Sequence, residues 1–257
     1  RVPRPLPDAG GPRGARPRGR VSGGGPGPVP STVVLDVGEV LVDETRVFAV
    51  WADLLGVSAG TLAAVLGAAI VEGEDHVAAF AHVAPNVAWA ELEAEHEARY
   101  GGFAEADLYP DVRPALAAIR DAGLHVVLAG NQPERRTAQL RALDLPVDDV
   151  VTSDELGAEK PSPAFFAAVL ARLGDPDPAT VLYVGDRVDN DVLPALEAGM
   201  RVCWVRRGPW GQLQDLPDGV EADLSLEGLG ELPELLAAWR DGRFDDATAD
   251  GGAEVSA

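Results

Sequence analysis

Four charged residues in this chain are of types, and at positions, that could support chemistry. Asp36 directly follows a short apolar run, and Asp186 and Asp191, five residues apart, follow another. Carboxylate oxygens suit Mg²⁺, which usually takes one or two carboxylates together with water and substrate oxygens. Lys160 is the only lysine among 21 basic residues, and its compact ammonium can offset the charge of nearby carboxylates. The residues therefore predict a site where an anion, a lysine and a divalent cation meet.

The elements that position these residues are predicted from alternating short apolar runs and amphipathic stretches. Strands are predicted at 32–35, 125–129, 150–152, 181–184 and 201–205, and helices at 112–121, 133–143, 163–173 and 192–198. Near-continuous apolar strands separated by helices indicate an α/β fold with a doubly wound parallel sheet that is covered on both faces. Ligands bind such sheets beyond the carboxyl ends of the strands, which is where the charged residues fall.

One region, 44–108, interrupts this alternation, because its predicted helices follow one another without a strand. The predicted core is therefore made of 31–43 and 109–240, with a helical insertion after the loop of the first strand. Residues 1–30 are mostly Pro, Gly and Arg with little apolar surface to bury, so we expect a disordered arm. Residues 241–257 are expected to form a disordered acidic tail.

Charge and composition limit the classes of partner. The formal net charge is −21, of which the arm carries +5 and the remainder −26. A body this acidic repels phosphate backbones, so we expect no nucleic-acid partner. The single cysteine, Cys203, rules out an internal disulfide framework, and no stretch approaches about 18 uncharged apolar residues. We expect a soluble cytoplasmic protein with no membrane partner; its oligomeric state is not predicted.

Four motifs of the chain resemble those of the haloacid dehalogenase-like (HAD) hydrolase superfamily and occur in that superfamily's order. They are Val33 to Leu41 with Asp36, Val126 to Asn131, Gly157 to Pro163 with Lys160, and Val181 to Asp191. The resemblance spans roughly residues 31–209 and is that of a capped, phosphatase-like member whose first and second motifs are atypical. It implies that the insertion is the family's cap, which closes over the catalytic carboxylate and selects the substrate.

The resemblance also implies roles for individual residues. Asp36 takes the position of the nucleophile, which attacks phosphorus or carbon and forms an aspartyl ester that water then hydrolyses. Lys160 would neutralise charge that develops during the attack. The cofactor Mg²⁺ would be held by Asp36, Asp186, Asp191 and the backbone carbonyl of Gly38.

Two positions depart from the family's pattern. Family phosphatases place a second Asp two residues after the nucleophile as general acid and base, whereas this chain has Gly38; Glu39 is the nearest substitute. Motif two usually offers a Ser or Thr hydroxyl to the substrate, whereas this chain has Gly130, which leaves backbone N–H groups and Asn131 as substrate-binding donors. General acid–base help contributes typically about 10²–10⁴-fold, so an enzyme without a substitute would be slow.

These observations favour a Mg²⁺-dependent hydrolase, a phosphatase that acts on a small phosphorylated metabolite through an aspartyl-enzyme intermediate. Gly38 and Gly130 instead favour a catalytically degenerate protein that keeps the fold for binding or regulation. A dehalogenase-type hydrolase of C-halide bonds is the third possibility. It is less favoured because that branch manages without magnesium and this chain keeps both Asp186 and Asp191.

Overall fold

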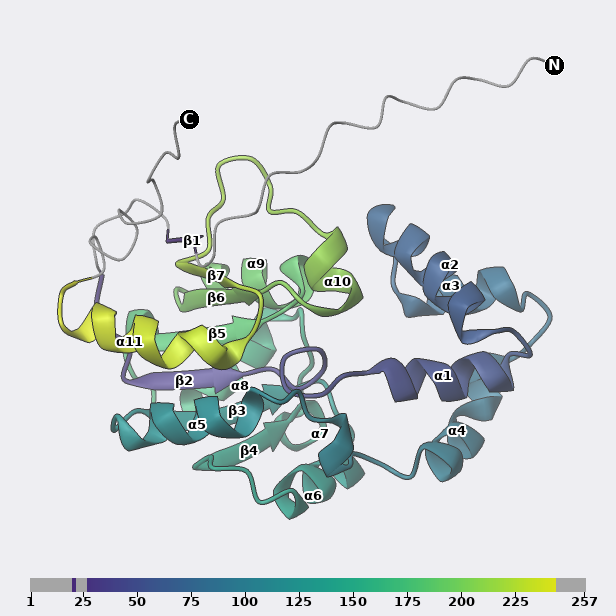
Figure 1. Cartoon of the computed structure of the whole chain (residues 1–257), viewed down its shortest axis with the longest axis horizontal. Helices are drawn as coiled ribbons and strands as arrows, with labels where there is room; N and C mark the ends of the chain where they lie inside the picture. The colour runs from purple at the N-terminus through teal and green to yellow at the C-terminus, as the bar shows by residue number, and fades with distance from the viewer. Residues whose placement is uncertain (1–19, 22–26, 244–257) are drawn as a thin grey trace, which may run out of the picture.

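The computed structural model describes residues 20–21 and 27–243, and its centre is a single sheet (Figure 1). The strand order is β1-β7-β6-β5-β2-β3-β4. Strands β2 to β7 are parallel, and β1 pairs antiparallel with β7. Because β2 lies between β3 and β5, the chain winds outward from β2 in both directions, which confirms the predicted doubly wound sheet. The strands are β1 Arg20–Val21, β2 Thr32–Leu35, β3 His125–Gly130, β4 Asp149–Thr152, β5 Val181–Gly185, β6 Arg201–Val205 and β7 Leu224–Leu226.

Helices cover both faces of the sheet. Along β2, Val33 and Leu35 pack with residues of α5 and α11 on one face, and Val34 packs with residues of α8 and α9 on the other. This division follows from the two-residue period of a strand. The helices are α1 Thr45–Leu54, α2 Ala59–Val71, α3 His76–Val83, α4 Glu93–Tyr100, α5 Val112–Asp121, α6 Glu134–Ala142, α7 Ser153–Leu156, α8 Pro163–Arg172, α9 Leu193–Glu197, α10 Gly208–Leu213 and α11 Leu232–Arg240. Single turns of other helix types are η1 Trp89–Leu92, η2 Glu105–Asp107, η3 Pro178–Thr180 and η5 Leu229–Glu231, all 3-10, and η4 Val188–Val192, a π-helical turn.

The segment between β2 and α5 forms a helical insertion. Its helices α1 to α4 lie beyond the carboxyl end of β2 (Figure 1) and enclose a separate apolar cluster that includes Trp51 and Phe80. Trp210 of α10 belongs to the same cluster, with its ring centroid 6.2 Å from that of Phe48. The insertion is therefore packed against the core through α10. Within the described residues no single helix is long and apolar enough to cross a membrane, and the apolar pair α1 and α2 is bent by 108°.

The elements that were not predicted are short or lie near the ends of the described chain. Strand β7 has three residues, and α10 and α11 each begin close to a Gly or a Pro, so their apolar patterns are too brief to stand out. Within the predicted arm, Arg20–Val21 pairs with β7 instead of lying free. The rest of the arm up to residue 26 and the tail from residue 244 lie outside the described residues.

Candidate active site

Three carboxylates converge beyond the carboxyl ends of β2 and β5. One oxygen from each of Asp36, Asp186 and Asp191 lies within 4.8 Å of the others. Asp36 follows β2, Asp186 follows β5, and Asp191 is in the π-helical turn η4. Asp36 is 8% exposed, Asp186 2% and Asp191 not at all. Neighbouring parallel strands end at one edge of a sheet, so their positions along the chain bring these groups together.

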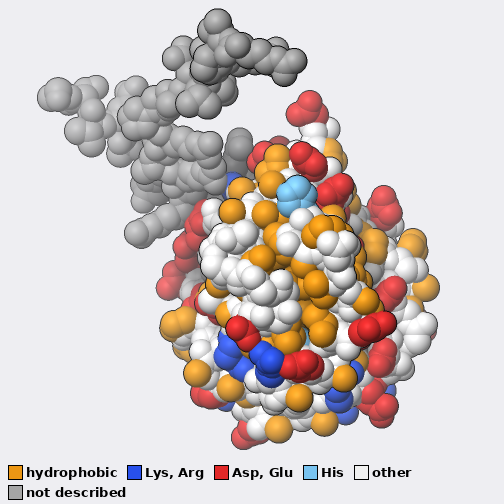
Figure 2. All heavy atoms as spheres, turned by 90° about the vertical axis from the view of Figure 1, so that its right-hand side faces the viewer, with side chains coloured by type: hydrophobic (Ala, Val, Ile, Leu, Met, Phe, Trp, Pro, Cys, Tyr) orange, Lys and Arg blue, Asp and Glu red, His pale blue; other side chains and the backbone are white. Residues whose placement is uncertain are grey.

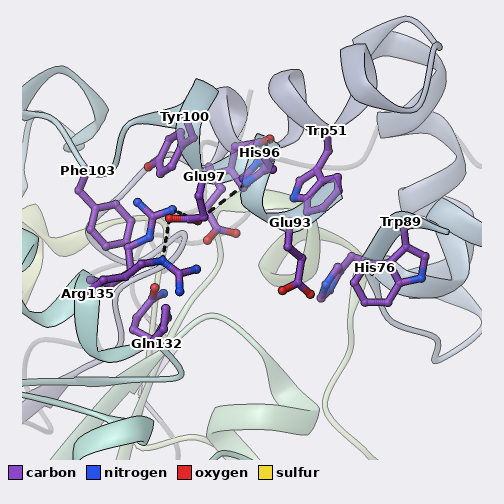
Figure 3. Close-up of a pocket in the computed structure, with 14 residues that line it drawn as sticks. Trp51, His76, Trp89, Glu93, His96, Glu97, Tyr100, Phe103, Gln132 and Arg135 are labelled. Carbon is purple, nitrogen blue, oxygen red and sulfur yellow. Dashed lines mark hydrogen bonds and ion pairs between the residues drawn. The ribbon is translucent and has the colours of Figure 1, made fainter. Parts of the chain in front are cut away.

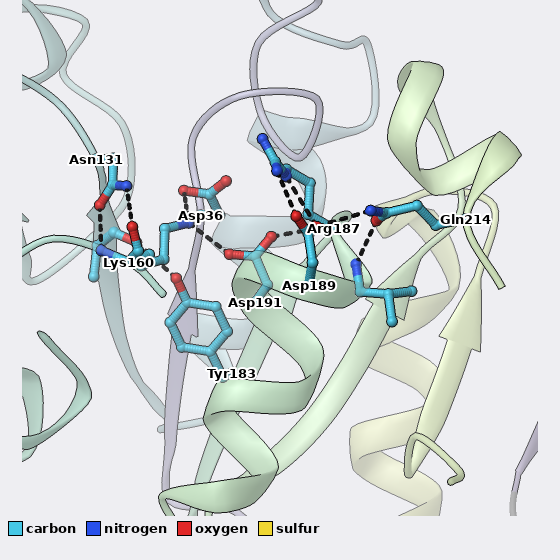
Figure 4. A network of polar contacts seen from close by, with 10 residues as sticks. Asp36, Asn131, Lys160, Tyr183, Arg187, Asp189, Asp191 and Gln214 are labelled. Atoms are coloured by element: carbon cyan, nitrogen blue, oxygen red, sulfur yellow. Dashed lines mark hydrogen bonds and ion pairs between the residues drawn. The ribbon is translucent and has the colours of Figure 1, made fainter. Parts of the chain in front are cut away.

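Lys160 connects two of the three carboxylates (Figure 4). Its Nζ lies 2.7 Å from Asp36 Oδ1 and 2.5 Å from Asp191 Oδ1. Burial by itself would lower the pKa of this ammonium, but Asp191 and Asp36 outweigh it and hold the pKa well above its ordinary value. Lys160 is therefore charged, and its single positive charge serves two buried carboxylates.

Asp186 is the member of the cluster that lacks a counter-charge. Within residues 27–243 its carboxylate accepts no hydrogen bond and forms no ion pair. Burial, and then the charges of Asp191 and Asp36, raise its pKa well above the ordinary value. Burial likewise raises the pKa of Asp191 to about 6 although Lys160 opposes the shift. Three converging carboxylates with one ammonium form a donor set that fits a hard divalent cation such as Mg²⁺. The backbone carbonyl of Gly38, predicted as a further ligand, accepts a hydrogen bond from Val40 N at 2.6 Å.

Asn131 and Lys160 are joined by a pair of hydrogen bonds. Asn131 Nδ2 donates to the Lys160 carbonyl at 2.9 Å, and Lys160 N donates to Asn131 Oδ1 at 2.7 Å. Both ends of the Asn131 amide are therefore used on the backbone of the lysine (Figure 4). The Asn131 side chain therefore holds the backbone of Lys160 in place.

Gly130 leaves room for the carboxylate of Asp36. A Cβ at position 130 would lie 2.6 Å from Asp36 Oδ1, closer than atoms in contact can approach. The Ser or Thr that the family's second motif usually has would therefore displace the predicted nucleophile from its place beside Lys160. The atypical second motif has a steric reason in this structure.

Glu44, which the sequence did not indicate as a site residue, takes up the space beside Gly38. A Cβ on Gly38 would lie 2.7 Å from Glu44 Oε1. Burial, and then the charges of Glu39 and Asp36, raise the pKa of Glu44 to about 8. The tight turn in which Leu41 N and Val42 N both donate to the Val37 carbonyl leads the chain back toward Gly38. A six-residue separation in sequence gave no sign of this contact.

Glu39, the predicted acid/base, has both carboxylate oxygens hydrogen-bonded. Tyr109 OH donates to Oε2 at 2.5 Å, and Glu44 N donates to Oε1 at 3.3 Å. The backbone of Glu39 has φ 52°, and its carboxylate lies against Gly208, where a Cβ would be 2.5 Å from Glu39 Cδ. Burial raises the pKa of Glu39. These contacts connect the loop after β2 to α10 and to the segment before α5, so the Glu39 carboxylate holds this loop in place.

A cavity of about 220 Å³ lies between the insertion and the core (Figure 3). Glu44 is one of its lining residues, so the cavity adjoins the carboxylate cluster. Its wall combines aromatic side chains with charged groups from α4 and α6; the other lining residues are Val47, Trp51, His76, Trp89, Glu93, His96, Glu97, Tyr100, Phe103, Gln132, Pro133, Arg135 and Arg136. Seen from this end, the molecule shows many apolar side chains near its centre, basic groups gathered below them beside acidic ones, and further acidic groups around the rim (Figure 2).

Known proteins resemble this chain in sequence and in fold. The glyceraldehyde 3-phosphate phosphatase of Methanopyrus kandleri is 32% identical over 155 residues, which are 59% of this chain and 65% of the relative. The pyrimidine 5'-nucleotidase YjjG of Escherichia coli is 34% identical over 89 residues, 35% of this chain and 38% of the relative. The chain thus spans less than two thirds of the length of these curated relatives.

A solved structure shows that the fold is shared. The L-2-haloacid dehalogenase of Xanthobacter autotrophicus superposes with a TM-score of 0.62 at 21% identity, covering 81% of this chain and 98% of that one. The model of the haloacid dehalogenase-like hydrolase family matches residues 30–199, which include Asp36, Lys160 and Asp191. The match confirms the resemblance predicted from the four motifs, and the chain belongs to the haloacid dehalogenase-like hydrolase family.

Proposed function

We propose that this protein is a phosphatase that hydrolyses small phosphate monoesters through an ester formed on Asp36. The observation that carries the proposal is the buried set in which Lys160 Nζ lies 2.7 Å from Asp36 and 2.5 Å from Asp191, with Asp186 beside them. Burying so many charged groups costs desolvation free energy, and such clusters are concentrated at functional sites, where they bind charged substrates. The two relatives described above are named as a phosphatase and a nucleotidase, and both names denote hydrolysis of a phosphate ester.

In the proposed reaction a carboxylate oxygen of Asp36 attacks phosphorus, and the bond from phosphorus to the leaving-group oxygen breaks. Lys160 keeps Asp36 ionised and offsets the charge of the phosphoryl oxygens. Backbone N–H groups at Gly130 and Asn131 are the proposed donors to those oxygens. Mg²⁺, held by Asp36, Asp186, Asp191 and the Gly38 carbonyl, would neutralise part of the substrate's negative charge when it is bound.

Glu44 is the proposed proton donor. Its carboxyl group would protonate the departing oxygen and, once ionised, would take a proton from the water that hydrolyses the Asp36 ester. The support is geometric: its carboxylate lies where a side chain on Gly38 would begin, and it faces the cavity for the leaving group. The cap role of 44–108 and a cytoplasmic location belong to the same proposal.

The test is phosphate release from an aryl phosphate and from a panel of small alkyl phosphates, with Mg²⁺ and with a chelator. We expect Mg²⁺-dependent release by the wild type and none by Asp36→Asn. Asp53→Asn is the matched control, because Asp53 lies on the surface with a side chain that is 74% exposed, and it should behave as wild type. Equal, negligible rates for the wild type and Asp36→Asn on every ester would disprove the proposal and favour a non-catalytic binding protein.

A further inference from the structure

Two charged groups in the cavity face it without a complete set of partners. Glu93 of α4 forms no hydrogen bond or ion pair with any described residue. Arg135, in the first turn of α6, donates through Nε to Glu97 Oε2 at 2.8 Å. In the described part of the chain its two terminal nitrogens donate to no acceptor. The guanidinium is therefore fixed along one edge and open along the other.

The other charged side chains on this wall satisfy one another. Arg136 Nη2 lies 2.5 Å from Glu97 Oε1, and Arg136 Nη1 donates to Gln139 Oε1 at 3.0 Å. Burial would raise the pKa of Glu97, but Arg135 and Arg136 outweigh it and lower the pKa. Glu97 thus stays ionised, and its single negative charge forms ion pairs with both arginines. One positive charge is left over, and it lies at the exposed end, on Arg135.

The two histidines of the cavity do not neutralise Glu93. Burial lowers the pKa of both His76 and His96, so both rings are neutral near pH 7. His96 is in addition stacked on Trp51, with ring centroids 4.3 Å apart, and its Nε2 lies 3.2 Å from the Val47 carbonyl. The negative charge of Glu93 is therefore available to a ligand.

Glu93 and Arg135 come from opposite sides of the cavity, one from the insertion and one from the core (Figure 3). They form no ion pair with each other, although the negative charge of Glu93 helps to raise the pKa of Arg135. A carboxylate suits the open edge of a guanidinium, which can donate two parallel hydrogen bonds. An ammonium suits Glu93, and the ring of Trp89, which lines the same cavity, would favour a cation further.

We propose that the substrate's leaving group carries both an ammonium and a carboxylate, as in an O-phosphorylated amino acid, with Glu93 binding the ammonium and Arg135 the carboxylate. This inference rests on the proposed function, since it assumes that the phosphoryl group binds at Asp36. A ligand held at both ends would add to the ion pairs of Arg135 and Arg136 with Glu97, which already connect α6 of the core to α4 of the insertion.

The test compares kcat/KM for O-phospho-L-serine with two analogues that each lack one charge. Phosphoethanolamine lacks the carboxylate, and 3-phosphooxypropanoate lacks the ammonium. We expect the wild type to prefer O-phospho-L-serine over both by about three- to tenfold, mainly through KM, a size typical of partly exposed charge pairs. Glu93→Gln should remove only the preference over 3-phosphooxypropanoate, and Arg135→Gln only the preference over phosphoethanolamine.

An aryl phosphate that carries neither an ammonium nor a carboxylate tests the phosphatase proposal separately from the proposed leaving group. The surface controls Glu91→Gln and Arg120→Gln, whose side chains do not line the cavity, should hydrolyse it at the wild-type rate, and each cavity variant is judged by the kcat/KM ratio of its charged esters to this aryl ester. If the aryl ester is hydrolysed but the three charged esters are used equally, the substrate inference is wrong and the phosphatase proposal stands. If no ester, the aryl phosphate included, is hydrolysed, both are wrong.

Discussion

Glu44 Oε1 lies 2.7 Å from the place where a Cβ on Gly38 would be. The carboxylate of Glu44 therefore occupies the space that a side chain at position 38 would fill. Gly38 is needed for the close approach, and Glu44 brings an acidic group to the same place from the first residue before α1. The absence of the family's second aspartate does not by itself make the site inactive.

Gly38→Asp alone should not raise activity, because the new side chain meets the carboxylate of Glu44. We expect a loss of about 1–3 kcal/mol in the free energy of unfolding from crowding, measured by urea denaturation. Gly38→Asp combined with Glu44→Ala should recover stability and turnover of alkyl phosphates. A single variant that is as stable as wild type and more active would contradict this arrangement.

Glu44→Gln should slow alkyl phosphates by about 10²–10³-fold and aryl phosphates much less, because an aryl leaving group needs little protonation. The ratio of the two kcat values measures this. Glu39→Gln is the control: it should weaken the contact with Tyr109 and lower stability without changing the ratio. The reverse outcome would return the acid/base role to Glu39.

Metal-free protein should become less stable as pH rises from about 4 to about 8, because the pKa of Glu44 is raised to about 8 as well. The pKa of Asp191 is raised to about 6 and that of Asp186 is raised as well, so the folded state binds more protons than the unfolded state in this range. Mg²⁺ should cancel the loss at neutral pH. The measurement is the thermal midpoint across pH with Mg²⁺ and with chelator; Asp186→Asn should reduce the difference between them. An identical pH profile in both buffers would contradict a metal site at these carboxylates.

Lys160→Met should abolish turnover and destabilise the fold by about 3–5 kcal/mol near neutral pH, because Asp36 and Asp191 lose their shared buried counter-charge. Chemical denaturation and phosphate release test the two effects. Asp36→Asn introduced into the same variant should restore part of the stability but not the activity. An active Lys160→Met protein would show that the ammonium is dispensable.

Gly130→Ser should lower activity at least about tenfold although it supplies the hydroxyl that family members usually have, because its Cβ would lie 2.6 Å from Asp36 Oδ1. Gly130→Ala is the matched variant, with the same Cβ and no hydroxyl. Equal losses in the two would confirm a steric cause. A serine variant that is clearly more active than the alanine variant would show that the site accommodates the hydroxyl.

Much of the fold was readable in the sequence because it depends on local pattern. The apolar runs predicted β2, β6 and α5 at their observed bounds, and parallel strands must end at one edge. That edge brings Asp36 and Asp186 together, and the loops after β4 and β5 add Lys160 and Asp191. The motifs around them were enough to indicate the family.

Only the tertiary structure decided which side chains complete the site. The tight turn after Asp36 brings Glu44 back to Gly38, and nothing in a six-residue spacing indicates that path. The side-chain amide of Asn131 hydrogen-bonds to the Lys160 backbone because two separate loops meet there. Glu93 and Arg135 face one cavity because the insertion packs on the core. Such contacts depend on how loops and packed units approach one another, and the periodicity of apolar residues along the chain does not predict that approach.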